Sequence, residues 1–218
     1  MLSRPQGCET CPLNTTSKAG FCPDKIPVNA KILFLAEAPG TTEITKAEPM
    51  VGKAGFVLRE WLVKNVPLLR IAMERDEVGL ANVLRCLPKE IQGRPYPRGQ
   101  EKEQAEAICR QHDAWPDSIH TYVLFGEHSQ RLLFKQELEA EDAQDRALGH
   151  DLKGVTGRVG RVYERDGKRW VFAPHPAYIL RQPALVTHGQ RALEIATGVD
   201  RVVAPEYHSW VSAMGELL

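Results

Sequence analysis

Five consecutive apolar residues, Ile32 to Ala36, run directly into the tetrapeptide Glu-Ala-Pro-Gly. An apolar run that ends in Pro-Gly is typical of a strand buried on both faces that leaves its sheet through a tight loop. A helical pattern follows at about residues 53–65, and we expect Pro67 to end it. Taken alone, this stretch is an ordinary strand-to-helix connection, because it lacks a phosphate-binding fingerprint. Its loop carries three carboxylates: Glu37, Glu43 and Glu48.

Strand-like and helix-like segments alternate along the rest of the chain. Apolar runs predict two further buried strands, at 78–84 and 121–125, and alternating segments around Asp166-Gly167 predict a hairpin, at 159–163 and 169–173. Helices are expected at about 100–113, 127–135 and 187–197. This order predicts an α/β fold, a three-layer sandwich with a mainly parallel central sheet of about four strands flanked by helices.

We expect a single domain that covers residues 1–218, since this length suits one sizeable core. Residues 1–30 show no sustained periodicity, so they need an external tie, and the proline-rich stretch at 87–99 is expected to be a loop. The acidic stretch 136–151 indicates a surface segment, either a solvated helix or a flap. The last segment, 199–218, is expected to be a tail that packs on the body.

Charge and hydropathy indicate the cellular compartment and the kinds of partner that the protein could bind. The chain has 28 basic and 28 acidic residues, so no global excess of positive charge points to nucleic acid, although a local basic patch is enough for binding. No stretch approaches the roughly 20 apolar residues of a membrane helix, and the N-terminus lacks the apolar core of a signal peptide. We therefore expect a cytoplasmic monomer with no membrane partner.

Five cysteines suggest a metal or cluster site. In a reducing compartment cysteines are more often ligands or buried apolar residues than disulfide partners. Four of them could tie the irregular N-terminus to the second strand and a helix: Cys8, Cys11, Cys86 and Cys109. Zinc and iron–sulfur both accept four thiolates, and Cys22 is a rival for the fourth position. The alternative is a set of unconnected buried thiols.

Polar or permissive residues follow four of the predicted strands. In parallel sheets the working residues lie in loops at the carboxyl ends of the strands. We therefore expect the loop after Ala36 and the HPAYIL segment to open onto one crevice. Taken singly, a loop glutamate, a strand-end asparagine and a histidine between prolines also have ordinary structural roles. The residues expected to converge are Glu37, Asn82, Gly126 and His175.

The order of the motifs resembles that of the family 4 uracil-DNA glycosylases over about residues 8 to 195. The motifs are Cys-x-x-Cys-Pro-Leu, ILFLAEAPG, P-x-V-G-x-A-G, N-V-x-x-C, a helix that bears a cysteine, and HPAYILR. The resemblance implies a DNA glycosylase of base excision repair that hydrolyses the N-glycosidic bond of uracil in single-stranded or duplex DNA. It also implies a structural [4Fe–4S] cluster on Cys8, Cys11, Cys86 and Cys109, with zinc as the alternative metal, and it leaves Cys22 spare.

The resemblance further implies roles for the site residues around an extruded nucleotide. Glu37 and Glu43 would lie near the sugar, one orienting the attacking water and the other stabilising the cationic sugar. His175 would donate to the uracil O2, and the Asn82 amide matches the N3–H and O4 edge of uracil. The remaining pocket residues would be Ala38, Gly40 and Met50, with Arg181 on the DNA.

Departures from the family pattern keep other functions open. The family has an aromatic residue where this chain has Met50, an acid where it has Ile44, and usually Gly where it has Ala36. Compared with the family, the acidic segment 136–151 resembles an insertion. The flexible thioether of Met50 stacks on a base in a less defined geometry than an aromatic ring does, so we expect weaker uracil binding or a shifted base preference. The chain could thus act on another modified base or bind nucleic acid without cutting; a metal-stabilised binding protein is the third hypothesis. DNA contacts are also expected from two basic stretches, 85–102 and 153–170.

Overall fold

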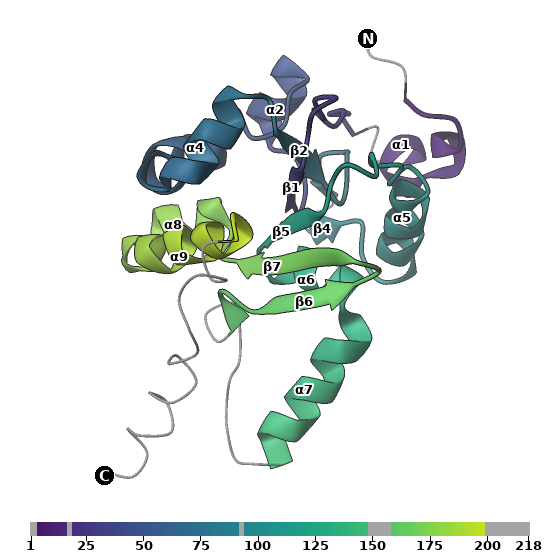
Figure 1. Cartoon of the computed structure of the whole chain (residues 1–218). Coiled ribbons are helices and arrows are strands. Elements are labelled where there is room, and N and C mark those ends of the chain that lie inside the picture. Colours follow the sequence, from purple (N-terminus) through teal and green to yellow (C-terminus); the bar gives the residue numbers. More distant parts are fainter. Residues whose placement is uncertain (1–3, 17–18, 92–93, 148–157, 199–218) are drawn as a thin grey trace.

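A five-stranded sheet with the strand order β2-β1-β5-β7-β6 forms the centre of the fold (Figure 1). The computed structural model describes residues 4–16, 19–91, 94–147 and 158–198. The first four strands in that order are parallel, and β6 pairs antiparallel with β7 at one edge. The mainly parallel sheet is therefore confirmed, with one strand more than expected. The strands are β1 (Ile32–Ala36), β2 (Val78–Asn82), β5 (Thr121–Phe125), β6 (Val162–Arg165) and β7 (Lys168–Ala173).

Helices cover both faces of the sheet. In β1, Phe34 faces one apolar cluster and Leu35 faces the other, and all five residues are buried, as a continuous apolar run predicts. Figure 1 shows α4, α8 and α9 together on the first side of the sheet. The first side holds α3 (Lys53–Phe56), η2 (Val57–Leu62), η3 (Val63–Asn65), α4 (Pro67–Glu74), α8 (Pro176–Arg181), η5 (Pro183–Leu185) and α9 (Val186–Ala196). The second side holds α6 (Glu127–Leu133) and α7 (Lys135–Ala147).

The N-terminal segment lies beside the end of β2. It contains η1 (Cys8–Thr10) and α1 (Pro12–Thr15), and α1 contacts α5 (Gln100–Arg110). A third apolar cluster between these helices includes Cys11, Cys86 and Cys109. None of the helices in the described ranges has the length and apolar character needed to cross a membrane.

One sequence expectation about a loop was wrong, and the helix that begins at Pro67 was missed. Helical structure from residue 53 does end at Asn65, but Pro67 begins α4 instead of only stopping the preceding helix. Proline suits this first helical position because the N–H it lacks would have no partner there. The expected loop at 87–99 contains an antiparallel ribbon of β3 (Lys89–Ile91) and β4 (Arg94–Tyr96). A two-stranded ribbon tolerates proline because each strand has an open edge.

The predicted hairpin at the edge of the sheet is confirmed. Arg165 pairs with Lys168, so the turn consists of Asp166 and Gly167 alone. Their φ angles of 54° and 70° are those of a type I′ turn, which requires a left-handed conformation at both positions. This turn fixes the register of β7 and hence the position of the residues that follow Ala173.

The acidic stretch forms a helix, α7, which is one of the two structures that the sequence led us to expect. Its carboxylates are not simply solvated, because three of them contact arginines that precede or belong to β6. The arginines of the basic stretch 153–170 that form these pairs therefore face α7. Residues 148–157 and the expected tail, 199–218, lie outside the described residues. The pairs are Glu137 with Arg165, Glu141 with Arg161, and Asp142 with Arg158.

Arg85 joins three segments that are distant in sequence. Its side chain is 5% exposed and donates to the Asp24 carboxylate at 2.8 to 3.0 Å and to Asp113 Oδ1 at 2.9 Å. A further bond at 2.8 Å reaches the carbonyl of Cys109 in α5. Because Cys22 N also donates to the Arg85 carbonyl, this one residue ties the N-terminal segment, the end of β2 and α5 together.

Replacing Arg85 is expected to destabilise the protein strongly. Arg85→Met leaves two partly buried carboxylates without their cation, so the free energy of unfolding should fall by about 3 kcal/mol or more. Lys25→Met breaks the exposed pair with Glu48 and should cost less than about 1 kcal/mol. Urea unfolding of both variants checks this; equal losses would contradict it.

Candidate active site

One cavity of about 550 Å³ lies at the carboxyl ends of the parallel strands. Glu37, Gly126 and His175 line it, and each directly follows or lies within two residues of the end of its strand. The loop after Ala36 and the HPAYIL segment thus open onto the same space, as expected from the sequence. The remaining lining residues come from α6 and α8: Glu127, His128, Arg131, Ala177, Tyr178 and Arg181.

Glu37 is held at this cavity through its backbone. Val83 N donates to the Ala36 carbonyl at 2.8 Å, and Leu84 N donates to the Glu37 carbonyl at 2.9 Å. The pairing of β1 with β2 therefore continues beyond both strands. The Glu37 side chain is exposed, and its carboxylate has no hydrogen bond to any described residue. It is free to contact a water molecule or a cationic group in the cavity.

His175 has a defined protonation pattern. Its Nδ1 accepts a hydrogen bond from Ala177 N at 3.1 Å at the start of α8. Because Nδ1 is an acceptor, the neutral ring carries its proton on Nε2. Burial lowers the pKa of His175 from its ordinary value, and Glu37 opposes this shift. The imidazole is therefore a neutral donor at neutral pH.

Gly126 allows His175 to lie close to the end of β5. A Cβ atom at this position would be 3.1 Å from the His175 Cβ. The φ angle of Gly126 is also +86°, which side chains rarely tolerate. Both constraints favour glycine here.

Asn82 is the last residue of β2 and pairs with Ala36 across the sheet. Its side chain is 4% exposed, and its amide has no hydrogen bond to any residue in the described ranges. The amide atoms still reach the surface, because neither belongs to the fully buried polar atoms that lack a partner. Asn82 does not line the cavity described above, although it lies at the same edge of the sheet.

Glu43 braces the loop from inside. It lies in α2 (Thr41–Lys46) and is buried. One carboxylate oxygen accepts from Gly40 N at 3.0 Å and the other from Gly52 N at 2.9 Å. The sequence led us to expect a contact with the sugar, but both oxygens face backbone amides and Glu43 does not line the cavity. These contacts close the loop between Gly40 and Gly52.

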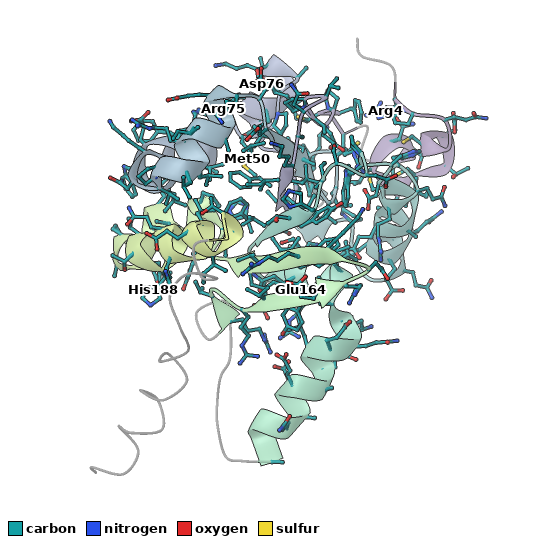
Figure 2. The ribbon with its side chains drawn as sticks, in the orientation of Figure 1. Arg4, Met50, Arg75, Asp76, Glu164 and His188 are labelled. Atoms are coloured by element: carbon teal, nitrogen blue, oxygen red, sulfur yellow. The ribbon has the colours of Figure 1, made fainter. Side chains whose placement is uncertain are left out.

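Met50 belongs to the core. Its side chain is 4% exposed, and Figure 2 shows it in the interior beside the strands. Arg59 Nη1 donates to the Met50 carbonyl at 2.7 Å, and a Cβ on Gly55 would lie 1.6 Å from that oxygen. The backbone of Met50 is thus fixed with a φ of 60°. Neither Met50 nor the other two expected pocket residues, Ala38 and Gly40, line the cavity.

Four cysteines line a second, smaller cavity, and they are those expected from the sequence: Cys8, Cys11, Cys86 and Cys109. All four are buried, and Arg4, Arg85 and His112 line the same cavity. His112 Nε2 lies 3.6 Å from the Cys8 sulfur, and Arg4 is visible beside α1 in Figure 2. Cys22 is also buried but does not line this cavity.

Burial favours the protonated form of three of these thiols, Cys8, Cys86 and Cys109. Burial raises the pKa of Cys8 and Cys86, and raises that of Cys109 to about 12. No three His, Cys, Asp or Glu side chains among the described residues are arranged to hold a metal ion. Four sulfurs around one zinc ion would be only about 3.8 Å apart, given a Zn–S distance of about 2.3 Å.

Sequence reasoning missed the wall of the cavity that α6 provides. Only Gly126 was expected there, whereas Glu127, His128 and Arg131 also line it. These residues lie in an ordinary helical pattern, so their types gave no signal. Their position directly after the carboxyl end of a parallel strand was the available clue.

Comparison with known proteins gives a consistent result. A model of the uracil DNA glycosylase superfamily matches residues 23–196. A protein of Archaeoglobus fulgidus named type-4 uracil-DNA glycosylase is 33% identical over 184 residues, which are 82% of this chain and 80% of that protein. A protein of the same name from Pyrobaculum aerophilum is 30% identical over 207 residues, 92% and 94% of the two chains.

The protonation of His175 can be tested directly. We expect its titration midpoint, measured by NMR of the imidazole, to lie below 6.5, with the Nε2–H tautomer above that midpoint. The unfolded chain then binds this proton more tightly than the native state. The contribution of His175 to stability is therefore present above about pH 6.5 and is lost as the pH falls. A midpoint of 6.5 or higher, or an Nδ1–H tautomer, would contradict this.

Proposed function

Since the chain belongs to the uracil DNA glycosylase superfamily, we propose that it hydrolyses the bond between uracil and deoxyribose in DNA. The relatives from Archaeoglobus and Pyrobaculum carry that activity in their names. The observation that carries the proposal is the presence of an unpaired carboxylate, Glu37, and a neutral imidazole donor, His175, in one cavity. These are the two groups that cleavage of an N-glycosidic bond needs.

The proposed mechanism assigns each group to the charge that develops beside it. The target nucleotide is extruded from the stack, because its sugar carbon cannot be reached within it. As the bond breaks, negative charge grows on the base, and His175 Nε2–H donates to the O2 of uracil. Positive charge grows on the sugar, and the Glu37 carboxylate stabilises it and orients the attacking water. The products are free uracil and an abasic sugar.

Asn82 is proposed to read the base. One orientation of its amide accepts from the uracil N3–H and donates to O4, whereas cytosine presents an acceptor and a donor at these positions. The nearly buried, unpaired amide supports this role, because a ligand would satisfy it. We assign Glu43 to positioning the Glu37 loop through Gly40 and Gly52, since both its oxygens are already bonded.

The cysteine cavity is proposed to hold a [4Fe–4S] cluster. Four buried thiols that line one cavity support this proposal, because a [4Fe–4S] cluster takes four cysteine ligands; zinc is the alternative metal. Such a cluster would supply a structural tie, without a step in the reaction. Cys8 and Cys11 belong to the N-terminal segment, Cys86 follows β2 and Cys109 lies in α5, so the cluster would join the same segments as Arg85.

Uracil excision tests the catalytic proposal. Oligonucleotides with one uracil, single-stranded and duplex, should be cleaved after alkaline treatment, and Glu37→Gln should slow the single-turnover rate by roughly 100-fold or more. Glu48→Gln is the matched control, since Glu48 lies in the same loop but pairs with Lys25. Intact uracil with the wild type, or equal rates for the two variants, would overturn the proposal. Cleavage at another modified base alone would favour a divergent specificity.

Iron content and visible absorption test the cluster. Wild-type protein purified without oxygen should be brown, and Cys109→Ala should lose most of its iron. Cys22→Ala is the control, because Cys22 is equally buried but does not line the cysteine cavity. Stoichiometric zinc in place of iron, or equal iron loss in the two variants, would count against the assignment.

A further inference from the structure

The cavity has two walls, and each carries an arginine. Arg181 comes from α8, which packs on the first side of the sheet, and Arg131 comes from α6, which packs on the second side. The Arg131 side chain is 40% exposed, so it can contact a ligand at the mouth. The sequence pointed to Arg181 for DNA binding but gave no role to Arg131.

An extruded nucleotide remains joined to its strand by a phosphate on each side. A cation on one wall alone can contact only one of these phosphates. We propose that Arg131 binds the backbone phosphate on the α6 side of the extruded nucleotide, opposite Arg181. This inference rests on the proposed function, because it takes the cavity to be the site of that nucleotide.

Two carboxylates fix the guanidinium of Arg131. Its Nε donates to Glu127 Oε1 at 2.6 Å, and its Nη1 and Nη2 donate to Asp142 Oδ2 at 3.2 and 3.3 Å. A guanidinium has five N–H groups and these contacts use three, so one N–H on each terminal nitrogen remains for a phosphate. A side chain that is already held loses less conformational entropy on binding.

Helix α7 contributes to the site through the carboxylate of Asp142, which contacts Arg131. Asp142 contacts both Arg131 and the buried Arg158, so Arg158 anchors the carboxylate that in turn orients Arg131. Glu127, Asp142, Arg131 and Arg158 together carry two negative and two positive charges. The phosphate contact therefore depends on directed N–H donors more than on a positive potential.

A second pair of contacts holds the neighbouring part of α6. His128 also lines the cavity, with Lys102 Nζ 3.1 Å from its Nδ1 and Glu106 Oε1 3.0 Å from its Nε2. Since lysine only donates, Nδ1 accepts the hydrogen bond from Lys102, whereas Nε2 and Glu106 Oε1 are close together but form no hydrogen bond. Helix α6 is thus braced from α5 on one side and from α7 on the other, which keeps Arg131 at the mouth.

Arg165 provides a matched control. Like Arg131 it contacts an α7 carboxylate, Glu137, and its side chain is 36% exposed. It does not line the cavity. A loss of DNA affinity that arose only from disturbing the arginine contacts of α7 would appear in both variants, whereas a phosphate contact would appear at Arg131 alone.

The test measures binding of the wild type, Arg131→Gln and Arg165→Gln to a single-stranded oligonucleotide with one 2′-fluoro-deoxyuridine, whose glycosidic bond resists cleavage. At low salt Arg131→Gln should weaken binding roughly tenfold, and the slope of log K against log salt should fall by about one. Arg165→Gln should match the wild type. On a cleavable uracil substrate, Arg131→Gln should raise KM with little change in the single-turnover rate, unlike Glu37→Gln.

Equal binding by Arg131→Gln and the wild type, or equal losses in the two glutamine variants, would overturn the inference. If Arg131→Gln fails to fold, Arg131→Lys replaces it; the lysine keeps the charge without the fork, and affinity equal to the wild type would then contradict a directed contact. Failure of the proposed function would give a different result from failure of this inference. In that case the wild type leaves uracil in place, yet the salt slope still depends on Arg131.

Discussion

The continued pairing of β1 with β2 beyond their ends organises the rest of the structure. Two backbone bonds, from Val83 and Leu84 to the carbonyls of Ala36 and Glu37, set the carboxylate loop against the chain that leads to Cys86. Asn82 precedes this pairing, and Arg85 follows it. The proposed catalytic carboxylate, the proposed base-reading amide and the cysteine cavity therefore share one short ladder, so disturbing it would affect all three.

Around that ladder, charged groups act mainly as braces. Glu43 closes the loop after Ala36, and Arg59 fixes the carbonyl of Met50. Arg85 joins the N-terminal segment to α5. Glu43 and Arg85 each satisfy two or more backbone or carboxylate partners at once, which stabilises irregular segments that have few backbone hydrogen bonds of their own.

The acidic helix α7 shows how a surface segment contributes to a cavity. Its carboxylates engage arginines beside β6, and Asp142 also reaches Arg131 at the cavity. Much of the local positive charge is thereby neutralised within the molecule. In the proposed enzyme, DNA would then be held by a few oriented donors near the extruded nucleotide more than by a broad basic surface.

The sequence alone predicted the segments that form the main sheet, its mainly parallel pairing, the hairpin at Asp166-Gly167 and the four cysteines of the second cavity, because apolar runs, turn residues and ligand spacing are local signals; it missed the ribbon of β3 and β4. It also indicated that Glu37 and His175 meet, since parallel strands end at one edge. Only the tertiary structure decided that Glu43 and Met50 turn inward, and that Arg131 reaches the cavity through a bond to α7. Those outcomes depend on which backbone amides, core space and carboxylates come near each side chain, and residues distant in sequence set that.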